Sequence, residues 1–75
     1  MHVTVIAVGI LGHYIPPSSG TEVLFAGATI EDLLGQLGIP AELVAMALVN
    51  GLQRPKGCLL AAGDIVKLIP LMGGG

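Results

Sequence analysis

The chain ends with the stretch Gly63-Asp64-Ile65-Val66-Lys67-Leu68-Ile69-Pro70, which Leu71-Met72-Gly73-Gly74-Gly75 follows without a linker. Gly63-Asp64 is typical of a turn, and the aliphatic residues from Ile65 to Pro70 predict a strand. Successive side chains of a strand alternate between its two faces. If Val66 and Leu68 face the core, Ile65, Lys67 and Ile69 face away and form a docking stripe that leads into the tail. The alternative is that another loop covers this stripe.

The three terminal glycines predict a flexible tail over residues 73–75, attached to a folded domain over residues 1–72, because glycine has no side chain to pack. Such a tail has one reactive group, the α-carboxylate of Gly75, on a chain thin enough to enter a narrow active site. A plain flexible end is the alternative interpretation. The position of the glycines directly after a core strand favours the carboxylate as the working group.

One amphipathic helix is predicted between residues 29 and 38. Thr29 is a suitable N-cap, and the helix dipole favours the acidic Glu31 and Asp32 in the first turn. Gly38 is a natural helix stop. The apolar residues of this segment recur at helical spacing and form one face, which we expect to pack on a sheet: Ile30, Leu33, Leu34 and Leu37.

Four further strands are predicted. Two precede the helix, at residues 2–8 and 21–25, with a loop or wide turn over residues 9–20 between them. Residues 44–49 are apolar throughout, as expected for a central strand that is covered on both faces. Asn50-Gly51 then predicts a type I′ hairpin turn, after which residues 52–56 return as a short edge strand.

The composition limits the classes of function. Of the 75 residues, 53% are hydrophobic and 11% are charged, which predicts an aliphatic core and surplus apolar surface for a partner. The net charge is −2, and the only cations, Arg54, Lys56 and Lys67, are too few for the phosphate contacts of nucleic-acid binding. The single Cys58 allows neither an internal disulfide nor a cysteine-based zinc site, so no metal site is expected.

No targeting or membrane signal is evident in the sequence. No apolar run approaches the ~20 residues of a membrane-spanning helix. The apolar residues near the start lack a preceding cation and a small-residue cleavage pattern, so they do not predict a signal peptide. We therefore expect a soluble cytoplasmic protein that contacts no membrane.

The predicted order β-β-α-β-β-β gives an α+β fold with one main helix packed across a mixed four- to five-stranded sheet. It resembles the ubiquitin-like β-grasp fold and, more narrowly, the MoaD/ThiS family of molybdopterin synthase small subunits and thiamine sulfur carriers. Three stretches carry the resemblance: residues 29–34, residues 48–51 and residues 60–70. Leu71 stands where the molybdopterin branch usually has a second proline, and Gly73 where an Ala or Gln commonly precedes the terminal pair.

The resemblance implies a sulfur carrier. In the family, a separate enzyme of the ubiquitin-activating type uses ATP to adenylate the terminal carboxylate, here that of Gly75, and a sulfur donor converts it to a thiocarboxylate. The expected acceptors are a molybdopterin synthase large subunit, for molybdopterin or tungstopterin, or else a thiazole synthase, for thiamine. The chain would then be a carrier without bound cofactor and without enzymatic activity of its own.

Within that resemblance, partner contacts are expected from the docking stripe and from the start of the tail, in which Gly73 and Gly74 precede the reacting residue. The expected partner-binding residues are Ile65, Lys67, Ile69, Leu71 and Met72. Two alternatives stay open. The first is a ubiquitin-like modifier that is conjugated through Gly75 to lysines, and the second is an interaction module with an inert tail.

Overall fold

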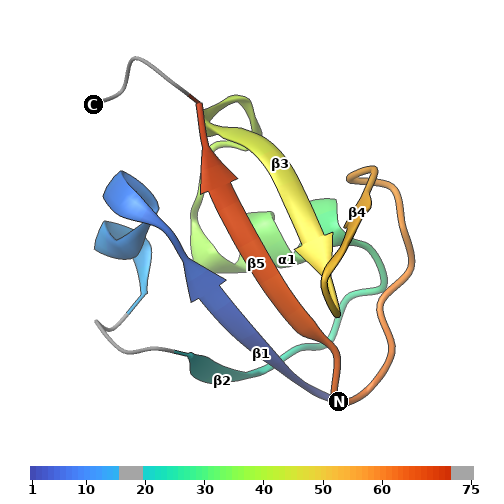
Figure 1. Cartoon of the computed structure of the whole chain (residues 1–75). Helices are drawn as coiled ribbons and strands as arrows, with labels where there is room; N and C mark the ends of the chain where they lie inside the picture. The colour runs from blue at the N-terminus through green and yellow to red at the C-terminus, as the bar shows by residue number, and fades with distance from the viewer. Residues whose placement is uncertain (16–19, 72–75) are drawn as a thin grey trace.

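The computed structural model describes residues 1–15 and 20–71, which form five strands, one α-helix and two 3₁₀ helices (Figure 1). The strands and the α-helix follow the predicted order. Their bounds are β1 His2–Ala7, β2 Thr21–Leu24, α1 Ile30–Leu37, β3 Val44–Val49, β4 Leu52–Arg54 and β5 Ile65–Pro70. The 3₁₀ helices are η1 Gly9–Tyr14 and η2 Ala41–Leu43.

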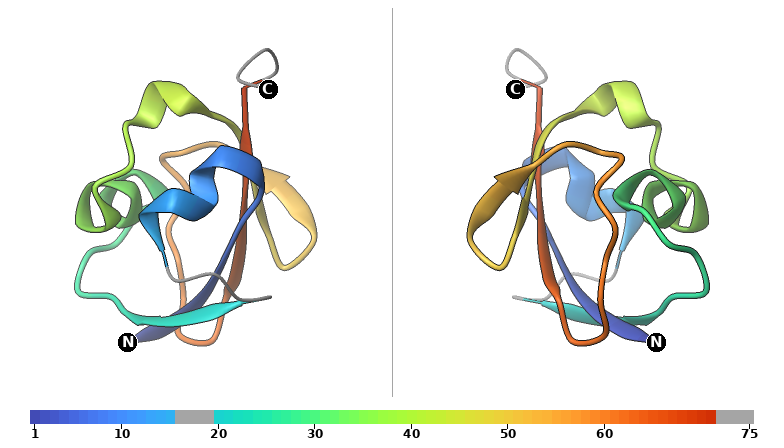
Figure 2. Two further views of the ribbon diagram at one scale, coloured as in Figure 1. Left: turned by 90° about the vertical axis from the view of Figure 1, so that its left-hand side faces the viewer. Right: turned by 90° about the vertical axis from the view of Figure 1, so that its right-hand side faces the viewer.

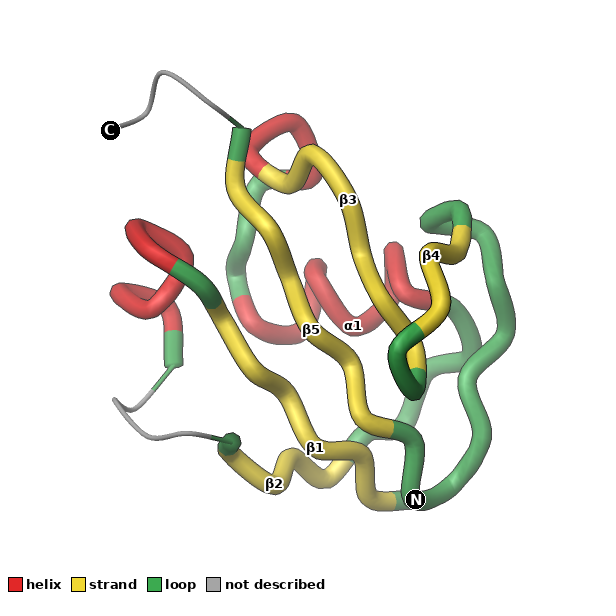
Figure 3. Tube along the Cα trace, in the orientation of Figure 1, coloured by secondary structure: helices red, strands yellow, loops and turns green. Residues whose placement is uncertain are grey.

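The five strands form one mixed sheet in the order β2-β1-β5-β3-β4 (Figure 3). β1 and β5 are parallel, with Val5 opposite Val66, and the other three pairs are antiparallel. The last strand in chain order is therefore the central strand of the sheet, hydrogen-bonded to a neighbour on each side. The fold class predicted from the sequence is confirmed, with five strands.

The helix α1 covers one side of the sheet, as the edge-on views in Figure 2 show. Its start is a capping box: the Thr29 hydroxyl accepts from the Asp32 N–H at 3.2 Å, and the Asp32 carboxylate accepts from the Thr29 N–H at 3.0 Å. Gly38 ends the helix with φ 75°. Both predicted helix boundaries are therefore confirmed.

The core lies between α1 and the sheet. Leu33 and Leu34 of the helix are buried, as predicted, whereas Leu37 is only half-buried because it lies at the last turn. The fully buried side chains that meet there are contributed by the helix, by the strands and by the segments between them: Val3, Val5, Leu11, Phe25, Ile30, Leu33, Leu34, Val44, Val66 and Leu68.

A polar contact joins the β3–β4 hairpin to the start of β5. Asn50 and Gly51 have φ values of 53° and 87°, which are those of the predicted type I′ turn. The Asn50 amide donates to the Asp64 carboxylate at 2.9 Å and accepts from the Ile65 N–H at 2.9 Å. Asp64 also accepts from the Ala61 N–H at 2.8 Å, which agrees with its place in the predicted turn.

Three local predictions are corrected by the structure. Residues 9–14, expected as loop, form η1, because burying Leu11 in the core fixes this part of the connection. β3 is covered on one face only: α1 lies on that face, Ala45 is exposed, and Met46 and Leu48 are half-buried. The edge strand β4 ends at Arg54, two residues early, because the next residue is a proline, which has no N–H for the ladder.

Candidate functional site

The end of β5 is the point from which the predicted tail leaves the sheet. Pro70 is paired with Val44, and the Leu71 N–H donates to the Leu43 carbonyl at 3.1 Å. This hydrogen bond fixes the direction of the chain at Leu71, whose side chain is 50% exposed. The predicted site residues Met72, Gly73, Gly74 and Gly75 lie outside the residues that the structure describes.

The parallel pairing of β1 with β5 brings the beginning of η1 to the same end of the sheet. The Val8 N–H donates to the Leu68 carbonyl at 3.0 Å, and a Cβ added at Gly9 would lie 3.5 Å from Pro70 Cγ. Val8 and Ile10 keep 36% and 39% of their surface exposed beside this exit. The sequence did not assign them to the site, because Val8 was predicted to end the first strand and Ile10 to lie in a loop or wide turn over residues 9–20. Two apolar residues flanking a glycine were the available signal.

The predicted docking stripe faces away from the helix, as strand alternation required. Val66 and Leu68 are fully buried, whereas Ile65 is 47% exposed and Lys67 is exposed. Ile69 is half-buried. The cross-strand neighbours of these residues complete a surface that we call the outer face: Thr4, Ile6, Met46, Leu48, Ile65, Lys67 and Ile69.

Apart from Thr4, the outer face consists of apolar side chains around one cation, Lys67. Lys67 lies opposite Ile6 of β1 and opposite Leu48 of β3. Apolar area of this kind favours association, and a single charge among apolar side chains orients a partner more than it strengthens binding. The outer face thus suits an apolar partner surface that presents an acidic group, and Leu71 extends it towards the tail.

The described part of the chain also contains side chains of metal-ligating types and one free thiol. Its His, Cys, Asp and Glu residues form no group of three or more that could hold a metal ion. Cys58 is half-buried, and its thiol lies 3.4 Å from the Leu59 carbonyl. Among residues 1–15 and 20–71, no helix has the length and apolar character needed to cross a membrane.

A mixed five-stranded sheet that packs on one helix and has its last strand at its centre defines the chain as a ubiquitin-like β-grasp protein. The chain belongs to the ThiS family, whose model matches residues 12–75. The crystal structure of SAMP1 from Haloferax volcanii superposes with a TM-score of 0.69 and 24% identity, over 100% of both chains, and supports the same fold. No curated protein sequence matches the chain.

The family match gives the coarse functional class. The chain is a sulfur-carrier or ubiquitin-like protein, and members of this class act with an adenylating enzyme and with sulfur-accepting enzymes. The resemblance stated from the sequence is confirmed at this level. The family match also includes the glycine tail that follows Leu71.

Proposed function

We propose that this chain is a sulfur carrier: the Gly75 carboxylate is adenylated by a separate enzyme, converted to a thiocarboxylate, and donates its sulfur in cofactor biosynthesis. Molybdopterin or tungstopterin is the first assignment for the product, and thiamine is the second. The main support is the ThiS family match, which runs to Gly75. The chain itself serves as carrier or non-catalytic subunit, and ATP is bound and used by its partner.

The fold supplies a rigid base for that carboxylate. β5 is hydrogen-bonded on both sides, and the Leu71–Leu43 hydrogen bond fixes the last described residue. Four residues follow Leu71, and an extended chain spans at most about 3.6 Å per residue, so the carboxylate reaches up to about 14 Å from the sheet. An active site recessed by that distance can receive the tail while the domain stays outside it.

The chemistry explains why glycine suits the tail. A Gly75 carboxylate is ionised at neutral pH and is a poor electrophile. In the first step a carboxylate oxygen attacks the α-phosphorus of ATP, and pyrophosphate leaves. In the second step a sulfur donor attacks the acyl carbon, and AMP leaves with the bonding electrons. Without a Cβ at residues 74 and 75, the acyl carbon stays open to both approaches.

Deletion of Gly75 tests the carboxylate. Incubated with its adenylating enzyme, ATP and sulfide, the full chain should gain the mass of one sulfur in place of one oxygen. The deletion variant should keep its original mass, while its thermal midpoint stays unchanged. Equal conversion of both chains would contradict the proposal. A covalent ladder on lysines in a denaturing pull-down, with no thiocarboxylate, would assign the modifier role instead.

The outer face is the proposed docking surface for both partner enzymes, with Ile65, Lys67 and Ile69 contributing alongside Leu71 and Met72. Ile65→Asp is the sharpest probe, because Ile65 is 47% exposed and tolerates a charge in the free protein. We expect the Kd for the adenylating enzyme to rise about tenfold or more. The matched control is Leu59→Asp, at a residue that is 72% exposed and outside this face.

Comparison of the two aspartate variants decides the docking surface. The Kd of the Leu59→Asp protein should stay within about twofold of that of the unmodified chain. A tenfold change in Kd corresponds to about 1.4 kcal/mol, so this difference is small. Both variants should unfold at the same temperature as the parent. Equal binding losses for both, or none for Ile65→Asp, would place the docking surface elsewhere.

A further inference from the structure

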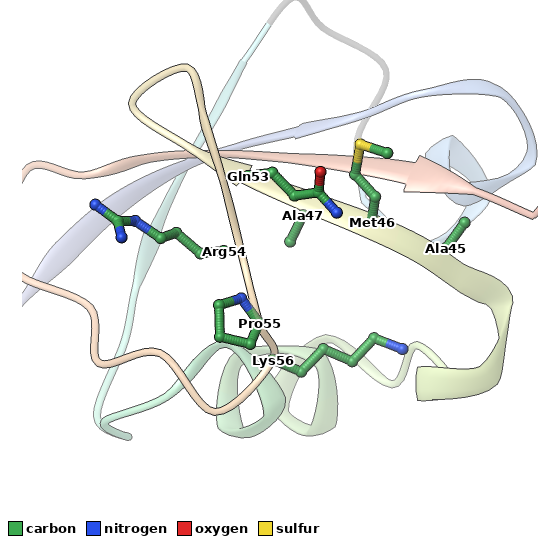
Figure 4. Close-up of a pocket in the computed structure, with 7 residues that line it drawn as sticks. All are labelled: Ala45, Met46, Ala47, Gln53, Arg54, Pro55 and Lys56. Atoms are coloured by element: carbon green, nitrogen blue, oxygen red, sulfur yellow. The ribbon is translucent and has the colours of Figure 1, made fainter.

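A cleft opens between β3 and the segment that follows β4. β3 has six residues, but β4 pairs with only three of them, from Val49 opposite Leu52 to Ala47 opposite Arg54. From Ala47 back towards Val44, β3 and the segment after Arg54 diverge. The cleft between residues 45–47 and residues 53–56 has a volume of about 520 Å³ (Figure 4).

The cleft exposes the backbone edge of β3. On the β5 side the register passes from Val44–Pro70 to Met46–Ile69, so Ala45 is a bulged residue without a partner. On the cleft side, no backbone hydrogen bond joins residues 44–46 to residues 55–57 in the described chain. Pro55 has no N–H with which to close this edge. A strand edge left open in this way accepts an added strand.

The far wall of the cleft is fixed by hydrogen bonds to the helix. The Cys58 N–H donates to the Pro55 carbonyl at 2.9 Å, which closes a turn. The carbonyls of Lys56 and Cys58 accept from the Glu31 and Ile30 N–H groups, at 3.0 and 3.2 Å, in the first turn of α1. A cleft whose walls are already held apart needs little ordering when a ligand binds.

Two cationic residues line this cleft, and Figure 4 shows their charged ends pointing to opposite sides. Arg54 and Lys56 are two of the chain's three cations. Arg54 is exposed, and no hydrogen bond or ion pair engages its guanidinium within residues 1–15 and 20–71. The Lys56 ammonium donates once, to the Ala41 carbonyl at 2.8 Å, and retains two further donors.

The two sides of the cleft differ in character. Arg54 is paired with the buried Ala47 and so lies on the helix side of the sheet, where Lys56 also reaches Ala41. Met46 lies on the other side, with the outer face. Because side chains alternate along a strand, an added strand would present every second residue to the cations and the others to Met46.

We propose that this cleft binds an extended segment of a partner protein in which acidic and apolar residues alternate, and that the segment adds as a strand to the open edge of β3. Its acidic side chains pair with Arg54 and Lys56, and its apolar side chains lie against Met46. The cleft is at the opposite edge of the sheet from β2, and of the residues that line it only Met46 also belongs to the outer face.

Two peptides and two variants test the inference. The probe is an N-acetylated, C-amidated hexapeptide of alternating valine and glutamate, and its control carries glutamine in place of glutamate. Each is titrated to about 1 mM into ¹⁵N-labelled protein and followed by NMR. The glutamate peptide should shift the amide signals of residues 44–47 and of Gln53, Arg54 and Lys56, and slow hydrogen exchange at Ala45. The glutamine peptide should bind about tenfold more weakly, since charged hydrogen bonds are the stronger ones.

The matched variants are Arg54→Ala and Lys67→Ala, which each remove one exposed cation. Arg54→Ala should weaken binding of the glutamate peptide about tenfold, and Lys67→Ala by no more than about twofold. The inference is overturned by an absence of shifts, by shifts centred on the outer face, or by equal losses in the two variants. It is also overturned if inorganic phosphate produces the same shifts, which defines a simple anion site, or if the free chain dimerises through this edge.

Discussion

Replacement of Leu34 by alanine tests the packing of α1 on the sheet, on which the position of β5 depends. Leu34 is 1% exposed and lies beside the equally buried Leu33. Removing a buried leucine side chain costs about 2–5 kcal/mol, because transfer free energy is lost and a cavity is left. At roughly 0.05–0.15 kcal/mol per residue, a chain of 75 residues has a total stability of about 4–11 kcal/mol. With the middle value of each range, the variant should lose about half of this stability.

Urea unfolding followed by far-UV circular dichroism measures this loss, since the chain has no tryptophan to report it. With a slope of about 1 kcal/mol per molar, the midpoint should fall by about 2–5 M. Leu24→Ala is the control, because Leu24 is 67% exposed and should cost under about 0.5 kcal/mol. A Leu34→Ala midpoint within ~0.5 M of the parent, or an equal loss for Leu24→Ala, would refute the helix packing described.

Two further predictions concern the polar contacts at the turn and the helix start. Asn50→Ala should destabilise by about 2 kcal/mol, because it removes two hydrogen bonds and leaves a Cβ at φ 53°, whereas Asn50→Gly should cost about 1 kcal/mol. Equal urea midpoints for Asn50→Ala and Asn50→Gly would show that the positive φ at this position does not contribute to the loss of stability. The N–H groups of Ala28 and Thr29, with the Thr29 hydroxyl, hold the pKa of Asp32 below its ordinary value. The stabilisation of the folded state by ionised Asp32 is fully present above the pKa that Asp32 has in the unfolded chain. It is lost as the pH falls through the lower pKa that Asp32 has in the folded chain, so the urea midpoint should decrease when the pH is below about 4. Asp32→Asn should reduce that drop, and an unchanged pH profile would contradict the assignment.

The parts of the fold that the sequence predicted are those with local signals. The helix from Thr29 to Gly38 was predicted by an N-cap, an apolar period and a terminal glycine, all within ten residues. The Asn50-Gly51 turn was equally local, since both residues adopt positive φ. Alternation alone placed Ile65 and Lys67 on the face opposite Val66, because β5 is regular throughout.

The remaining parts depend on contacts between distant segments. The parallel pairing of β1 with β5 joins residues about sixty positions apart, and only this pairing places Val8 and Ile10 beside the tail exit. The bulge at Ala45 and the early end of β4 likewise follow from how three strands meet, so the cleft between them had no sequence signal. Ile69 was expected to face away from the core with Ile65 and Lys67, and with Met46 opposite it is half-buried. It is therefore a poorer probe of docking than Ile65.

The central place of β5 has a consequence for how this protein is made. The β1–β2 pair and the β3–β4 pair share no ladder with each other, and only β5 joins them. Until residues 65–70 have been synthesised, the growing chain therefore consists of two separate hairpins and a helix with no completed sheet to pack on. A chain cut short within β5 cannot form the outer face. Formation of the sheet thus depends on one late segment, β5, and an activating enzyme that docks on the folded sheet, as proposed above, would discriminate against unfinished chains.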